Sequence, residues 1–159
     1  MKRILFLLSA ACLATGVAAR ADAPPASPSP EDLVAMRKGG MDMSTAVLAG
    51  AGAIANGDGP LKALALPVRG LVNWADALPS TFPAGSGDVA DSRAKPEIWS
   101  DWAGFTARAE EFRRATGAMQ AAVAANDRDA LVSALASTKA ACKGCHDSYQ
   151  IPPARRPGD

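Results

Sequence analysis

Apolar residues recur at spacings of three and four along much of the chain, which predicts amphipathic helices. The most regular stripe lies in residues 96–126 and comprises Ile98, Trp102, Phe105, Ala109, Phe112, Thr116, Met119 and Val123. A further stripe in residues 127–149 comprises Leu131, Leu135, Thr138, Cys142, Cys145 and Tyr149. Neither stripe is interrupted, so each predicts one continuous helix with one face in a hydrophobic core.

A first helix is predicted from Pro30 to about Asn56, because Ser29 can cap its first turn and proline suits the first helical position. Its main apolar stripe, which we expect to face the core, comprises Met36, Gly40, Met43, Val47, Gly50 and Ile54. A second stripe comprises Leu33, Arg37, Met41, Ser44 and Leu48. An arginine on this semi-apolar face indicates a buried or partly buried anion. The pair Gly39 and Gly40 costs about 1 kcal/mol per glycine, which indicates a close approach to a ligand or a neighbouring helix, or simply a bend.

Pro60 opens a second helical segment that reaches about Leu78, and Pro67 is expected to bend or interrupt it. Residues 79–95 are rich in Pro, Gly, Ser and Asp. They predict a long loop that folds over the bundle or over a site. Asp127 can cap the last helix, which the two prolines after Ile151 would end.

Four amphipathic helices with mostly short connections predict an all-α fold, an antiparallel up-down-up-down four-helix bundle over residues 31–152, with residues 153–159 as a C-terminal tail. Composition agrees, because the aromatic fraction is 5% and β-branched residues are sparse. Lys and Arg number 17 against 16 Asp and Glu, in a chain that is 48% hydrophobic. This balance argues against a nucleic-acid partner and against a disordered chain.

The N-terminus carries the pattern of an export signal. Lys2 and Arg3 precede an apolar run over residues 4–17, and small residues follow at the spacing that a signal peptidase requires. We expect residues 1–21 to be cleaved and residues 22–30 to form a flexible leader. A membrane anchor is disfavoured because the run is shorter than the ~20 residues that span a bilayer. The predicted location is the periplasm.

Cleavage would remove Cys12 and leave two cysteines, Cys142 and Cys145, followed directly by His146, the only histidine of the chain. On a helix these three side chains point to the same side. Cys-x-x-Cys-His is the attachment signature of c-type haem, in which two thiols bond to the porphyrin and the histidine coordinates the iron. A thioredoxin-like redox pair and a zinc site are the alternatives, but the first needs a helix start after a strand and the second lacks further ligands.

A secreted, all-helical chain with its haem motif on the last helix resembles the class II c-type cytochromes, the cytochrome c-prime family and its low-spin relatives. The resemblance covers about residues 31–150. It is carried by Arg37 with Met41, by the stretches 82–86 and 95–100, and by Cys-Lys-Gly-Cys-His-Asp-Ser-Tyr at 142–149. Family members usually carry a basic residue where this chain has Gln150. The resemblance implies one covalently attached haem c with iron, and Arg37 as the main partner of a haem propionate.

The resemblance also implies that the residue four after Arg37 decides the other side of the iron. An apolar non-ligand there leaves the iron five-coordinate and high-spin, able to bind nitric oxide or carbon monoxide. A methionine there can fill the sixth position and make a low-spin electron carrier. This chain has Met41 at that position, so Met41 is the predicted second axial ligand, with Met43 or an open position as alternatives.

The function expected from these residues is a periplasmic monohaem c-type cytochrome that carries single electrons between redox partner proteins of unknown identity, most like the low-spin, methionine-ligated members. The alternative is a five-coordinate protein that binds nitric oxide or carbon monoxide. No enzymatic turnover is predicted, because the sole histidine would be committed to iron and no other general base stands near the motif. Family members are often homodimers, and the sequence leaves the oligomeric state open.

Overall fold

The computed structural model describes residues 27–153. The predicted signal at 1–21, most of the predicted leader at 22–30 and all but the first residue of the predicted tail lie outside this range. The helices are α1 (Pro30–Ala55), α2 (Ala65–Ala77), α3 (Glu97–Ser100), α4 (Trp102–Ala125) and α5 (Arg128–Tyr149), with two short 3-10 helices, η1 (Leu61–Leu64) and η2 (Leu78–Thr81).

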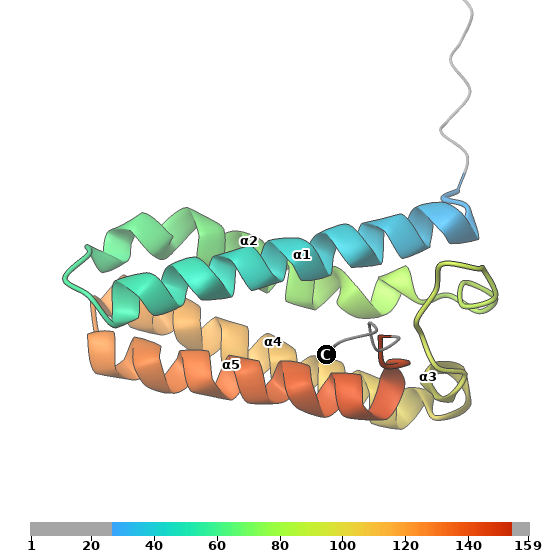
Figure 1. Ribbon diagram of the computed structural model, residues 1–159. Helices are drawn as coiled ribbons and strands as arrows, with labels where there is room; N and C mark the ends of the chain where they lie inside the picture. Colours follow the sequence, from blue (N-terminus) through green and yellow to red (C-terminus); the bar gives the residue numbers. More distant parts are fainter. Residues whose placement is uncertain (1–26, 154–159) are drawn as a thin grey trace, which may run out of the picture.

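The four long helices run alternately in opposite directions, and the α1 and α2 pair lies across the α4 and α5 pair (Figure 1). The predicted antiparallel four-helix bundle is therefore confirmed. Two starts follow the predicted chemistry: Ser29 and Asp32 form a capping box on α1, and Asp127 caps α5. Within residues 27–153, no helix is long and apolar enough to cross a bilayer.

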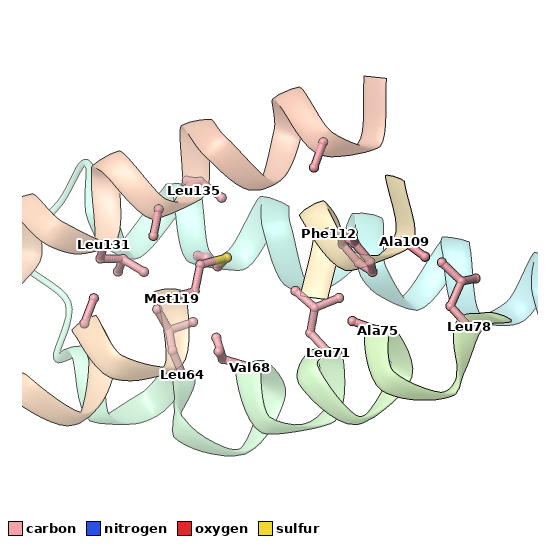
Figure 2. Close-up of a cluster of buried hydrophobic side chains, with 14 of the residues drawn as sticks. Leu64, Val68, Leu71, Ala75, Leu78, Ala109, Phe112, Met119, Leu131 and Leu135 are labelled. Atoms are coloured by element: carbon pink, nitrogen blue, oxygen red, sulfur yellow. The ribbon is translucent and has the colours of Figure 1, made fainter. Parts of the chain in front are cut away.

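The core is an apolar cluster in which side chains of α2, α4 and α5 interdigitate (Figure 2). Met119 and Leu131 are fully buried there, and Val68 of α2 packs into the same cluster. Most members are alanine, leucine, valine or phenylalanine. Small side chains on facing helices let the helices approach closely.

The face of α1 that meets the core is centred on the second stripe, and of the main stripe only the later members Val47 and Ile54 pack against the core cluster. The predicted orientation, with Met36 and Met43 in the core, is therefore wrong. Arg37 and Ser44 of the second stripe are buried, whereas Met36 and Met43 are 50% and 65% exposed. The reason is the pairing of α1 with α2 and α5, which buries Ala51 and Ala55 on the inward side. Hydrophobicity alone therefore mispredicts the buried face of a helix whose inner surface is lined with small and polar residues.

The predicted continuous helix over residues 96–126 is broken at Asp101, whose backbone leaves the helical region (φ −122°, ψ 56°). The side chain of Asp101 accepts a hydrogen bond from the Gly104 N–H, 3.1 Å away, and so starts α4 anew. As a result Trp102, expected in the core, is 42% exposed.

The loop between η2 and α3 folds back on the C-terminal end of α5, as its length predicts. The Lys95 N–H donates to the Tyr149 carbonyl at 3.0 Å, and Ala94 pairs with Gln150 in an isolated antiparallel bridge. On its other side the Ser86 carbonyl accepts a hydrogen bond from Arg37 of α1. The loop thus connects α1 to the end of α5.

Candidate functional site

A cavity of about 350 Å³ lies between α1, the loop after η2 and the last turns of α5. The α1 wall includes Arg37 and Met41, and the α5 wall includes Cys145 and His146. Its remaining surface is mostly apolar and includes Phe82. Four of the five residues predicted for the site are therefore brought to one cavity by two helices that are far apart in the sequence.

The fifth predicted residue, Cys142, lies one turn earlier on α5 and is not part of the cavity lining. It is half-buried and packs beside the core cluster, as Cys145 does. No disulfide joins Cys142 and Cys145 in the described residues. Helical spacing places Cys142, Cys145 and His146 on adjacent positions of the same side of α5.

Burial sets the protonation of these groups. It raises the pKa of the Cys145 thiol to about 11, and it raises the pKa of the Cys142 thiol as well. Burial also lowers the pKa of His146, and the positive charge of Arg93 lowers it further. A neutral imidazole has a lone pair for a metal ion. Thiols with raised pKa values argue against a thioredoxin-like pair, which depends on a low-pKa thiolate.

The zinc alternative gains no support from the described part of the chain. In residues 27–153, no three side chains of His, Cys, Asp and Glu converge as a metal cage requires. A structural zinc site is closed by four such ligands. A thiol pair beside a neutral histidine is compatible with covalent attachment of a group whose metal the histidine can bind.

Arg37 is the buried cation of the site, with 6% of its surface exposed. Its Nε donates to the Leu33 carbonyl at 3.2 Å, and its guanidinium stacks 4.4 Å from the centre of the Phe82 ring. Its Nη1 is buried and has no hydrogen-bond partner among residues 27–153. Burial lowers the pKa of Arg37, since it disfavours the charged form. A buried guanidinium with an unused donor fits an anionic group in the cavity.

The positions of Met41 and Met43 relative to the cavity distinguish these two candidates for the second axial ligand of the iron. Of the four methionines in residues 27–153, Met41 alone lines the cavity, where it is half-buried. Met43, the rival predicted from sequence, is 65% exposed on the outer side of α1. Met119 is fully buried in the core at a distance from the lining. Within the described structure, Met41 is therefore the methionine that shares a cavity with His146.

Two charged residues of the loop, Asp91 and Arg93, also line the cavity, and sequence reasoning missed both. Asp91 forms an ion pair with Lys38 of α1, with 3.4 Å between Oδ2 and Nζ. Loop residues carry no periodicity that indicates which way they face. The only available signal was the presence of basic residues in a loop long enough to reach the end of the last helix.

The geometry fits haem c: an apolar cavity, two thiols and a neutral imidazole on one helix, and a buried cation with an unused donor. A family model described as Cytochrome C' matches residues 32–150. The chain belongs to the cytochrome c' family. Members of this family carry one covalently attached haem c with its iron, and so does this chain.

Individual relatives agree. A cytochrome c' from Rubrivivax gelatinosus is 38% identical over 100 residues, which cover 62% of this chain and 78% of that protein. A cytochrome c' from Pararhodospirillum photometricum is 32% identical over 123 residues, which cover 77% of this chain and 98% of that protein. The structure of a nitric oxide complex of a mutant cytochrome c prime from Alcaligenes xylosoxidans matches with a TM-score of 0.72 and 27% identity, covering 80% of this chain and 99% of that chain.

Proposed function

We propose that the haem occupies the cavity between α1 and α5, with thioether bonds to Cys142 and Cys145 and with His146 as the proximal iron ligand. The unused Nη1 of buried Arg37 supports the assignment of that residue to a haem propionate. The haem supplies a redox-active iron whose face opposite the histidine can take a further ligand. The protein holds the imidazole in a neutral, half-buried state suited to that bond.

The function proposed for this site is binding of nitric oxide or carbon monoxide at the iron, on the face opposite His146. The observation that carries it is the cavity, which the apolar residues Val34 and Met41 of α1 line together with His146 of α5. Apolar walls exclude water and leave room for a small uncharged ligand. The nitric oxide complex of the Alcaligenes xylosoxidans relative supports this function over the electron-carrier expectation from sequence.

Electron transfer through low-spin iron is the second candidate, and one specific observation favours it. Met41 shares the cavity with His146, and a thioether that binds iron would fill the sixth position and compete with any gas. Iron held by histidine and methionine changes oxidation state with little change in geometry. The relatives named cytochrome c' give no support to a low-spin, methionine-ligated protein, so ligation of the iron by Met41 is the second proposal.

An absorption spectrum of the reduced protein, recorded with and without carbon monoxide, separates the two functions. The gas-binding proposal expects high-spin bands and rapid formation of the carbon monoxide complex. A low-spin spectrum that carbon monoxide does not change would contradict it and support Met41 ligation.

The variant Met41→Ala assigns the ligand in either case. If the iron is open, this substitution leaves the spin state of the wild-type protein unchanged. If Met41 is the ligand, the low-spin spectrum becomes high-spin. Met43→Ala is the matched control, because Met43 lies on the same helix outside the cavity and should change neither spectrum.

The setting of this function remains that predicted from sequence. We propose export to the periplasm by cleavage after residue 21, so that mass analysis of the purified protein should show a chain starting at Asp22 with one haem added. Redox partner proteins and a homodimer are further proposals. The outward-facing methionines of α1 support the second of these. No catalytic turnover is part of the proposal.

A further inference from the structure

The backbone of Arg93 is fixed to the segment that follows α5. Its carbonyl accepts a hydrogen bond from the Ile151 N–H at 2.8 Å, and its Nε donates to the Ile151 carbonyl at 2.9 Å. The neighbouring Ala94 pairs with Gln150 in the antiparallel bridge. These contacts hold Arg93 beside the chain just beyond His146, and the Arg93 side chain lines the same cavity.

The charge of Arg93 is not neutralised by a carboxylate. Within residues 27–153, no Asp or Glu oxygen lies at ion-pair distance from its guanidinium, and only its Nε makes a hydrogen bond. Asp147, the acidic neighbour of His146, is bound 2.5 Å away by Lys143. Arg93 and His146 line the same cavity. Arg93 is therefore a positive charge without a carboxylate partner in the cavity that His146 lines.

The group that would meet this charge is a haem propionate. A haem attached through Cys142 and Cys145 would bring two propionates, which are anionic and would need cations beside them. Two arginines line the cavity, Arg37 from α1 and Arg93 from the loop. The third cation of the lining, Lys38, is already paired with Asp91.

We propose that Arg93 pairs with the second haem propionate and so supplies, from the loop, the positive charge that Gln150 does not supply from α5. The bridge between Ala94 and Gln150 brings the two positions together in space, although they are far apart in the sequence. This role rests on the proposed ligation of iron by His146. It makes Arg93 a positioning residue that sets the charge around the haem.

The test is the midpoint potential of the haem in the complete protein, measured by spectroelectrochemistry on Arg93→Gln, Arg93→Lys and Arg69→Gln. Loss of a positive charge beside an anionic propionate favours ferric iron, so Arg93→Gln should lower the potential. Arg93→Lys should keep most of the wild-type value. Both Arg93 variants lose the hydrogen bond from Nε to the Ile151 carbonyl, but only Arg93→Gln loses the positive charge. The difference in potential between the two variants therefore measures the effect of the charge. Arg69→Gln removes an equal charge from exposed α2, outside the cavity, and should have no effect.

A relocation variant sharpens the test. Adding Gln150→Arg to Arg93→Gln should restore the potential, because Gln150 lines the same cavity and pairs with the residue next to Arg93. The inference is overturned if Arg93→Gln shifts the potential no more than Arg69→Gln does, or if lysine at position 93 restores nothing. Failure of the underlying proposal looks different: His146→Ala would then leave the wild-type absorption spectrum unchanged. Intact histidine bands with an unmoved potential refute the role of Arg93 alone.

Discussion

At the scale of single residues, Tyr149 shows how one hydrogen bond connects two helix ends. Its hydroxyl donates to Asp101 Oδ2 at 2.8 Å, and its ring packs edge-on against Phe105, with 5.6 Å between ring centres. Gly104 lies beneath this contact, where a Cβ would stand 2.5 Å from the Tyr149 oxygen. Asp101 therefore both caps α4 and holds the residue that ends α5, one turn after His146.

The contact between Tyr149 and Asp101 predicts that the Tyr149 phenol loses its proton only at high pH. The hydrogen bond to Asp101 raises the pKa of Tyr149 above its usual value of 10.0. The folded state thus binds the phenolic proton more tightly than the unfolded state, so this stabilisation is complete below pH 10 and is lost as pH rises through the raised pKa. Tyr149 is the only tyrosine, so ultraviolet difference absorbance titrates it directly. Asp101→Asn keeps a capping side chain but should lower the measured pKa.

The controls for this titration follow from the same geometry. Tyr149→Phe should abolish the phenolate signal and flatten the alkaline loss of stability in urea unfolding. A pKa that Asp101→Asn leaves unchanged would mean that the hydrogen bond does not hold the phenol in solution.

At the scale of elements, the packing of α1 on α2 depends on Gly40. A Cβ at this position would overlap the indole ring of Trp74 from α2, whereas a Cβ at Gly39 would meet nothing within 4 Å. From the sequence, the two adjacent glycines could serve a close approach to a ligand or a helix, or simply allow a bend. In the structure Gly40 allows the close approach of α2, whereas Gly39 contacts no neighbouring helix.

Alanine at these adjacent positions should have opposite effects. We expect Gly40→Ala to lower the free energy of unfolding by about 1–3 kcal/mol, because the indole has to move. We expect Gly39→Ala to raise it by about 1 kcal/mol through helix propensity alone. Urea unfolding of the haem-loaded proteins measures both. Equal effects of the two substitutions would show that Trp74 is not held against α1.

At the scale of the whole molecule, the outer side of α1 carries two exposed methionines, Met36 and Met43. An exposed apolar stripe on a long helix favours contact with a second copy of the chain. If the protein is a dimer through this face, Met43→Glu should convert it to a monomer, because two carboxylates would be buried together. Analytical ultracentrifugation of the haem-loaded protein measures the change. A wild-type protein that sediments as a monomer would remove the homodimer from the proposed function.

Sequence patterns predicted most of the architecture because capping and periodicity are local. Ser29 with Pro30 marked the start of α1, and Asp127 marked the start of α5. The haem motif was equally local, since its three reactive side chains lie within one helical turn. The break at Asp101 was missed because the apolar spacing continues through it, and only the backbone shows that α3 and α4 are separate.

The sequence by itself determined the helices, their order and the cofactor chemistry of α5. Only the tertiary structure decided which face of α1 turns inward, and with it that Met41 and not Met43 meets the cavity. It also decided that Arg93 reaches the end of α5. The physical reason is the same in both cases. Helix rotation and loop placement are fixed by contacts between segments distant in the chain, such as Gly40 with Trp74 and Ala94 with Gln150, and no local pattern encodes those contacts.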